Sequence, residues 1–252
     1  MDSAVARSGL PLAALAAVAA LSDESRRRLH DFVRRAGRPV SREEAAADAG
    51  ISRKLAAFHL DKLVEVGLLK ARFEPVGGIR KVGRTPKVYE PAEVDLRITI
   101  PGRHHDLLAA ILLDAVLAEG RAGSSVRDAA LTAAHRRGVA IGAAERDRVR
   151  PGRLGAERAL GLAEGVLTRY GFEPRRDGTS RLSLRNCPFQ PLAGDAPQLV
   201  CAINHALLSG LLEGLEAATV VAELAPRPGC CCVEFTTGQP ANDDSAAAAG
   251  PR

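Results

Sequence analysis

The residues best suited to chemistry in this chain of 252 residues are its five cysteines, all in the final third of the sequence: Cys187, Cys201, Cys230, Cys231 and Cys232. Three separate predicted turns or helix starts carry them, so folding can bring their thiolates together, as zinc and iron–sulfur clusters both require. His205 follows Cys201 by four residues and so shares its helical face. The sequence therefore predicts a metal or cluster site rich in thiols, to which His205 could add a nitrogen ligand.

Other interpretations of the cysteines stay open. Free cysteine also packs as a small hydrophobe, no Cys-x-x-Cys pair is present, and successive strand residues point to opposite faces, so at most two residues of the triplet can face one site. A thiol enzyme using Cys187 or Cys201 as nucleophile would need a paired histidine, and no signature among the six histidines provides one. We therefore expect no enzyme. An odd number of cysteines in a basic chain argues against a secreted disulfide framework.

A stretch with the pattern of a DNA-binding module precedes these cysteines by about a hundred residues. Ser41 and Glu44 predict a capping box at the start of a short helix. A turn at Gly50 leads to a second helix, with Ser52 as its N-cap and Gly67 just past its end. Alternating residues at 69–74 and 87–89 then predict a β-hairpin with a glycine-rich tip. This order of elements is typical of a winged helix-turn-helix.

The second helix of this module and the hairpin tip supply the candidate DNA contacts. One stripe of the helix is apolar and should pack inward: Ala56, Leu60, Leu63 and Val64. The opposite face presents Phe58 among cations, which suits a major groove where phosphates flank thymine methyl groups. The alternatives are a solvated face with Phe58 packed under a neighbour, and a charged tip that only protects a sheet edge. The predicted contacts are Ser52, Arg53, Lys54, Ala57, Phe58 and Lys62 in the helix, and Arg80, Lys81 and Arg84 in the tip.

Charge and hydrophobicity restrict the class of protein. Residues 1–103 carry 19 Lys and Arg against 13 Asp and Glu, whereas residues 104–252 carry 16 against 17, so the whole basic excess lies beside the predicted DNA-binding module. No apolar run approaches the roughly 20 residues that a membrane span needs. The apolar run near the N-terminus follows both Asp2 and Arg7, so we expect a packing helix there and not a secretory signal. We expect a cytoplasmic protein.

The predicted fold class is mostly α with α+β. An N-terminal winged helix-turn-helix should precede a helical dimerisation region and a C-terminal α+β sensor subdomain. Few aromatic residues (3%) and no Trp favour a core of Ala, Leu and Val, which suits helices. The expected divisions are an extension at 1–21, the winged helix-turn-helix at 22–93, a helical linker and dimerisation region at 94–170, the cysteine-containing subdomain at 171–237 and a disordered tail at 238–252.

Local patterns inside the two C-terminal divisions predict their elements. An alternating stretch favours a strand at 94–100, ended by Pro101. Apolar residues at helical spacing predict helices at 104–119, 121–149, 154–170 and 197–215. A hairpin is predicted over 171–186, and further strands at 219–225 and 232–237.

Several segments resemble known bacterial regulators. LSDESRRRLHDFVRRAGRPVSREEAAADAGISRKLAAFHLDKLVEVGLL and GRTPKVYEP resemble the N-terminal domain of ArsR/DeoR-like winged-helix transcriptional regulators. NCPF, LVCAINHALLSGLLEGL and CCCVEF resemble the sensor half of SufR-type repressors that respond to an iron–sulfur cluster. Together these segments lie between Leu21 and Phe235. The resemblance implies a homodimer on double-stranded DNA, with Cys187, Cys201 and one residue of the Cys230–Cys232 triplet as cluster ligands. Cys231 is the expected member of the triplet, and its neighbour Cys232 is a further candidate ligand.

The sequence departs from this pattern in two places. Thirteen residues separate Cys187 and Cys201, one more than the cluster-binding members lead us to expect, and the closing Cys-x-x-Cys of some members is absent. Zinc, or no metal, therefore stays an alternative, and the fourth ligand is open. The expected function is a sequence-specific DNA-binding repressor that senses an iron–sulfur cluster or metal. The alternatives are a winged-helix regulator with structural cysteines that responds to a small organic effector, and an adaptor that does not bind DNA.

Overall fold

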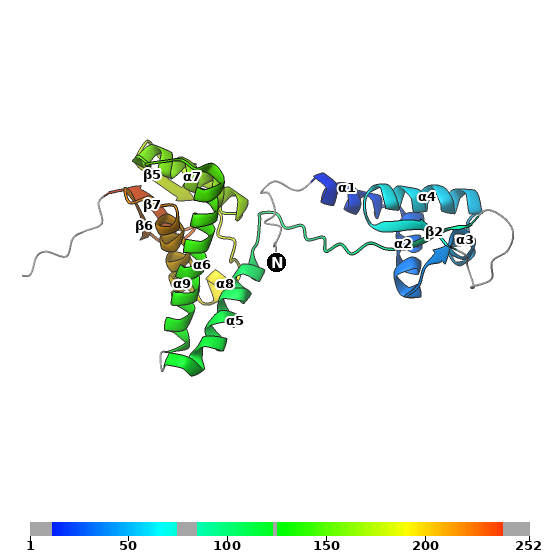
Figure 1. Cartoon of the computed structure of the whole chain (residues 1–252), viewed down its shortest axis with the longest axis horizontal. Helices are drawn as coiled ribbons and strands as arrows, with labels where there is room; N and C mark the ends of the chain where they lie inside the picture. Colours follow the sequence, from blue (N-terminus) through cyan, green and yellow to red (C-terminus); the bar gives the residue numbers. More distant parts are fainter. Residues whose placement is uncertain (1–11, 75–84, 123–124, 239–252) are drawn as a thin grey trace, which may run out of the picture. The chain divides into compact units, whose positions relative to one another are not determined.

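A computed structural model describes residues 12–74, 85–122 and 125–238. The described residues form two compact units, one ending at Ile98 and one beginning at Thr99. Each unit combines helices with one small antiparallel sheet, and helices predominate in both (Figure 1). The predicted fold class, mostly α with an N-terminal helix-turn-helix and a C-terminal α+β region, is confirmed.

The N-terminal unit is a helix-turn-helix with a hairpin. Its helices are α1 (Leu12–Ala20), α2 (Glu24–Ala36), α3 (Arg42–Ala49) and α4 (Arg53–Glu65). Its sheet has the order β1-β3-β2, and β3 is antiparallel to both neighbours: β1 (Val40–Ser41), β2 (Leu69–Phe73) and β3 (Lys87–Pro91). One core of apolar side chains from α2, α3, α4 and the sheet holds the unit together, and Ala17 of α1 joins it. The predicted N-terminal extension therefore contributes a packing helix to this unit.

The caps predicted at both short helices are present. The Glu44 amide donates to Ser41 Oγ at 3.2 Å, and the Ser41 amide donates to Glu44 Oε2 at 2.8 Å, which completes the capping box of α3. Gly50 closes that helix with a positive φ of 66°. Ser52 Oγ accepts from the Leu55 amide at 3.3 Å and so caps α4. Each such cap stabilises a helix by about 1 kcal/mol, which fixes where α4 begins.

Among its described residues, the C-terminal unit packs five helices against a four-stranded sheet. The helices are α5 (His105–Ala122), α6 (Val126–Val149), α7 (Ala156–Arg169), α8 (Leu192–Asp195) and α9 (Pro197–Gly214). The strands run in the order β4-β5-β7-β6, with every neighbouring pair antiparallel: β4 (Pro174–Arg176), β5 (Arg181–Leu184), β6 (Val220–Leu224) and β7 (Val233–Thr237). These elements confirm the predicted helices, the predicted hairpin and the two predicted last strands.

Glycine allows an unusually close crossing of α6 and α9, which lie side by side (Figure 1). Each helix carries two glycines four residues apart: Gly138 and Gly142 in α6, Gly210 and Gly214 in α9. A Cβ atom at any of the four would overlap backbone atoms of the other helix. The two backbones are therefore in direct contact, and this contact is the centre of the C-terminal unit.

One prediction from the sequence is wrong. The stretch from Val94 to Ile100 forms no strand, because an alternating sequence needs a partner strand and none pairs with it in the described part of the chain. The predicted boundary between 94–170 and 171–237 does not separate two compact units. Helices α5, α6 and α7 bury their apolar faces in the same core as α9 and the sheet, so the helical region and the cysteine-containing region form a single unit.

Candidate functional site

The inward face of α4 matches the prediction closely. Ala56, Leu60 and Leu63 are fully buried, and Val64 is half-buried. His59 is also buried, on the flank of this stripe. Because these side chains fix the rotation of the helix, the opposite face must point away from the core.

The outward face of α4 presents the residues predicted to contact DNA. Ser52, Arg53 and Lys54 are exposed in the first turn, and Lys62 is exposed near the end. Ala57 is half-buried between them. Lys62 pairs with Glu65 at 2.7 Å, but both side chains are well exposed, and such a surface pair contributes little. Cations and one small residue therefore line the helix face that would enter a major groove.

Two apolar side chains stand on this face. Phe58 is 55% exposed, with its edge against the His59 ring, and Leu55 is 42% exposed. Phe58 therefore does not pack under a neighbouring element, as one alternative had it. Leu55 was not among the predicted contacts, although it lies three residues before Phe58 on the same helix face. An exposed Leu–Phe pair between cations suits the apolar surface of thymine methyl groups.

Asp61 joins α4 to the hairpin. Its Oδ1 accepts from the Tyr89 hydroxyl at 2.9 Å and from Lys87 Nζ at 2.6 Å, and both partners belong to β3. Burial and the hydrogen bond to Asp61 raise the pKa of Tyr89, so its hydroxyl stays a donor at physiological pH. This acidic residue of an otherwise basic face is thus occupied in positioning the helix. This pairing could not be predicted from local sequence patterns, because the partners are 26 and 28 residues apart in the chain.

The hairpin predicted after α4 is present as β2 and β3, paired from Leu69 opposite Pro91 to Phe73 opposite Lys87. The predicted tip residues Arg80, Lys81 and Arg84 lie outside the described residues. The described part of the hairpin ends at the pair Phe73 and Lys87.

Four of the five cysteines meet in the C-terminal unit, and we refer to Cys187, Cys201, Cys231 and Cys232 as the thiol cluster. Cys187 lies in the loop after β5, Cys201 in α9, and Cys231 with Cys232 directly before β7. All are buried except Cys201, which is half-buried. Cys230 is exposed. Cys231 and Cys232 are adjacent, and both can still face the cluster because they precede β7, so the alternation of strand side chains does not apply to them.

Hydrogen bonds between thiols shift the acidity within the cluster. The neighbouring Cys231 thiol lowers the pKa of Cys187, and it lowers the pKa of Cys232 to about 6. The same bonds raise the pKa of Cys231 itself. Burial raises the pKa of Cys201 to about 12. Negative charge in the cluster is therefore most stable on Cys232 and Cys187, and thiolate is the form that binds metals.

A buried amide lies against these thiols. Asn204 of α9 is fully buried, and its Nδ2 donates to Cys231 Sγ at 3.1 Å. Its Oδ1 has no hydrogen-bond partner among the described residues. A buried polar atom without a partner is costly, and this oxygen is an acceptor, so a hydrogen-bond donor or a cation would satisfy it.

The thiol cluster has the chemistry of a metal or iron–sulfur site, but its side chains as placed do not have the geometry of one. Four sulfurs from three chain segments have the right chemistry for zinc or for a cluster. As placed, however, no three His, Cys, Asp or Glu side chains of the described chain surround a point where a metal ion could bind. Ligation would therefore require the thiol side chains to rotate toward a common point. His205 is turned away, since its Nε2 lies 3.0 Å from the Ala222 carbonyl oxygen.

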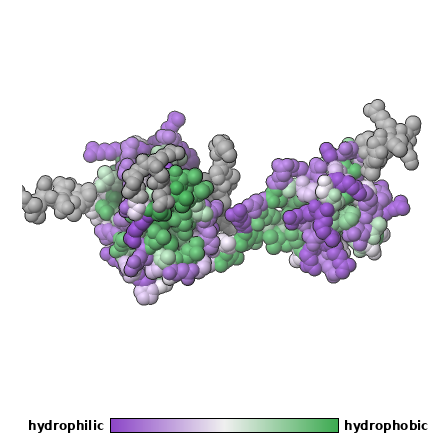
Figure 2. Space-filling view, turned by 90° about the horizontal axis from the view of Figure 1, so that it is seen from below, coloured by the Kyte–Doolittle hydropathy of each residue, from purple (hydrophilic) through white to green (hydrophobic). Residues whose placement is uncertain are grey.

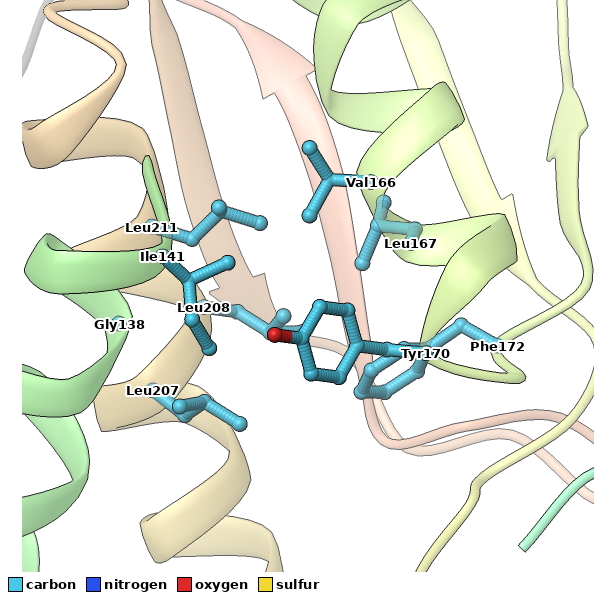
Figure 3. A pocket seen from close by; sticks show the side chains of 9 residues that line it. All are labelled: Gly138, Ile141, Val166, Leu167, Tyr170, Phe172, Leu207, Leu208 and Leu211. Atoms are coloured by element: carbon cyan, nitrogen blue, oxygen red, sulfur yellow. The ribbon is translucent and has the colours of Figure 1, made fainter. Parts of the chain in front are cut away.

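An apolar pocket lies between α6, α7 and α9, where an organic effector could be sought. Figure 3 shows the Tyr170 hydroxyl pointing across it toward α6 and α9. Its volume of about 10 Å³ is roughly the room for one water molecule. A pocket of this size is too small for an organic effector. The residues lining it are Gly138, Ile141, Val166, Leu167, Tyr170, Phe172, Leu207, Leu208 and Leu211.

The N-terminal unit is similar to a known protein family. A family model described as a helix-turn-helix domain matches residues 21–72, which span α2, α3, α4 and most of β2. No curated protein and no solved structure matches the chain. Among the described residues, no helix has both the length and the hydrophobicity needed to cross a membrane. Residues 21–72 are therefore a helix-turn-helix domain, and this match supports a DNA-binding transcription regulator.

Proposed function

We propose that this protein is a sequence-specific repressor that binds double-stranded DNA through α4. The observation that carries the proposal is the outward face of α4, where cations in the first turn precede an exposed Leu55–Phe58 pair. The cations supply attraction to phosphates, which does not depend on sequence, and the apolar pair supplies contacts to bases, which do. In this proposal the protein is a regulator and not an enzyme.

Two copies are needed in this proposal, because one helix-turn-helix reads one half-site and two-fold symmetry places the second reading helix about one turn of DNA away. Helix α5 offers the surface for pairing. It buries Leu108 and Ile111 toward the core but leaves Leu113, Val116 and Leu117 between 57% and 66% exposed. Figure 2 shows hydrophobic surface on one face of the C-terminal unit, to which α5 belongs. An uncharged face of this kind is complementary to itself, which supports a homodimer through α5.

The thiol cluster is the proposed sensing site, with an iron–sulfur cluster as its first candidate ligand and zinc as the second. An iron–sulfur cluster, when bound, would supply a redox-active group. The chain would hold it with Cys187, Cys201, Cys231 and Cys232, while the Asn204 amide donates to a ligating sulfur and lowers its negative charge. The burial of three of these thiols and the Asn204 donor to Cys231 Sγ support this proposal.

DNA binding is tested by selecting genomic fragments with the full chain and measuring their affinity at two salt concentrations. Phosphate-driven binding must weaken as salt rises. The double variant Arg53→Glu with Lys54→Glu should lose at least about a hundredfold in affinity, since it reverses two charges at the groove. Arg153→Glu with Arg158→Glu makes the same change of charge at exposed positions of the C-terminal unit and should bind as the parent does. Equal affinity of the first variant and the parent would refute the proposal.

A second experiment distinguishes the proposed phosphate contact of Lys54 from the proposed base contact of Phe58. Lys54→Ala should weaken binding to all sequences and reduce the salt slope by about one, whereas Phe58→Ala should leave the slope unchanged and reduce the preference for the selected site by about 1–3 kcal/mol.

Sensing is tested by the iron, sulfide and zinc content of protein purified without oxygen. A metal-free protein that takes up neither iron with sulfide nor zinc would leave the organic effector as the remaining sensing mechanism.

A further inference from the structure

Asp61 lies on the face of α4 that is proposed to enter the major groove. At about 100° per residue, it stands roughly 20° around the helix from Lys54 and roughly 60° from Phe58. Its side chain is 53% exposed. Helical side chains lean toward the N-terminus, and the residue one turn earlier is the small Ala57, so no long side chain of that turn covers the carboxylate. An acidic group is therefore accessible among the proposed DNA contacts.

One of the two carboxylate oxygens of Asp61 is held by the hairpin. The Tyr89 hydroxyl and Lys87 Nζ both donate to Oδ1, at 2.9 Å and 2.6 Å. Tyr89 is almost completely buried, so this contact fixes where the carboxylate points. In the part of the chain that the structure describes, the other oxygen, Oδ2, makes no hydrogen bond. The hairpin thus positions a carboxylate whose second oxygen is available to a ligand.

The major groove of DNA offers few partners to such an oxygen. Phosphates and the acceptor atoms of the bases repel it, which leaves two amino donors, N4 of cytosine and N6 of adenine. In adenine the amino group stands beside the acceptor N7, which would repel the carboxylate. Cytosine presents its amino donor without an acceptor of its own on that edge. An anchored carboxylate on this face therefore favours cytosine over the other bases.

We propose that Asp61 Oδ2 accepts a hydrogen bond from the N4 amino group of a cytosine in the major groove, which makes Asp61 a specificity-determining residue. This inference rests on the proposed function, because it names a base that the same face of α4 would read. Arg53, Lys54 and Lys62 carry only donors, so they cannot accept from an amino group. Lys87 lies against the carboxylate and offsets its charge, which reduces repulsion from the phosphates beside the groove.

The test selects binding sites for the full chain from a library of random duplex DNA. The parent should select cytosine at one position of each half-site. In Asp61→Asn, the donors of Tyr89 and Lys87 should hold the amide oxygen, so the amide NH2 group faces the groove in place of Oδ2. Thymine places its O4 acceptor where cytosine has its N4 donor. The variant should therefore prefer thymine over cytosine at that position by at least about fivefold, the reverse of the parent.

Two controls isolate this contact. Asp48→Asn removes the same charge from an exposed position of α3 and should select the same sequence as the parent. N4-methylcytosine at the selected position replaces the amino hydrogen that points into the major groove with a methyl group. This change should weaken binding of the parent by at least about fivefold. It should weaken binding of Asp61→Ala, which has no acceptor there and leaves room for the methyl group, by less than about twofold.

The outcomes distinguish failure of this contact from failure of the proposed function. If the parent selects no sequence, both proposals fail. If the parent selects a sequence and Asp61→Asn, shown by urea unfolding to be folded, selects the same bases at every position, Asp61 only positions α4. The cytosine contact is then overturned, and sequence-specific binding stands. If Asp61→Asn does not fold, N4-methylcytosine decides on the parent alone, since a change in affinity of less than about twofold overturns the contact.

Discussion

Asp61 of α4 and Tyr89 of β3 are joined by a hydrogen bond of 2.9 Å, although 28 residues separate them. Tyr89 is almost completely buried, and Lys87 contacts the same carboxylate oxygen at 2.6 Å. The helix proposed to enter DNA and the strand that leads to the hairpin tip therefore share one carboxylate. The orientation of α4 relative to the hairpin depends on this contact.

Tyr89→Phe removes only the hydroxyl of this pair and keeps the packing of the ring. We expect the free energy of unfolding to fall by about 1–2 kcal/mol, because a hydrogen bond to a charged group is lost while Asp61 keeps Lys87 and water. The measurement is urea unfolding of the full chain, followed by DNA affinity at fixed salt. An unchanged unfolding midpoint would show that the bond is not formed in solution.

Two kinds of glycine in the C-terminal unit predict effects of opposite sign. Gly210→Ala should destabilise the protein by about 1–3 kcal/mol or more, because the new methyl group overlaps the backbone of α6 and the two helices must separate. Gly165→Ala, in the exposed part of α7, meets only the end of the Arg169 side chain at 4.0 Å. It should stabilise the protein by roughly 0.5–1 kcal/mol through helix propensity. Thermal unfolding of both variants checks the pair, and equal effects would contradict the close crossing.

The substitution Asn204→Leu should affect the stability of the ligand-free protein and its affinity for a ligand in different ways. Without ligand, the substitution removes a buried oxygen that has no partner, so stability should be unchanged or higher. With ligand, the amide donor to the ligating sulfur is lost, and affinity should fall by about 10- to 100-fold, as for other outer-shell donors. Competition with a chelator measures this affinity, using Co²⁺ as the probe for thiolate ligation. Lower stability together with unchanged Co²⁺ affinity would assign Asn204 to packing alone.

Glu145 of α6 gives the stability a defined dependence on pH. It is buried and accepts from Arg148 and Arg169. The hydrogen bond from Arg148 is the main cause that lowers the pKa of Glu145 below its ordinary value. Its contribution is therefore complete above the unfolded pKa of about 4.3 and is lost as the pH falls through the folded pKa. Stability between pH 7 and pH 3 should fall less steeply in Glu145→Gln than in the parent. Glu157→Gln, at an exposed position of α7, is the matched control and should keep the parent's slope.

Local patterns in the sequence predicted most of the fold. Ser41, Glu44 and Ser52 identified two helix starts because capping depends on residues three apart, and the inward stripe of α4 followed from its period. The strand expected at Val94–Ile100 failed because pairing depends on a neighbour that the pattern does not contain. The shared core of 105–237 was missed for a similar reason, since both regions carry apolar faces and nothing local shows that these faces meet.

The candidate site could be predicted only in part. Composition and spacing identified the cysteines and the exposed face of α4, but not the residues that hold them. Asn204 reads as an ordinary polar residue of a helix, and Asp61 as a solvated one, until their partners at Cys231 and Tyr89 are known. Arg103 likewise contacts Asn186 and the Cys187 carbonyl, both more than 80 positions away in the chain. Long-range hydrogen bonds leave no periodic signal in a sequence.

The hydrogen bond from Asn186 Nδ2 to the Gly102 carbonyl has a practical consequence for anyone who studies the C-terminal unit in isolation. A fragment that begins at the first turn of α5 would omit Gly102 and Arg103 and leave the Asn186 amide without its acceptor there. Such a fragment would carry every cysteine and yet lack the contacts that Gly102 and Arg103 make with Asn186. Expression boundaries should therefore lie at or before Thr99, so that spectroscopy on the excised half reports the same chemistry as the intact chain.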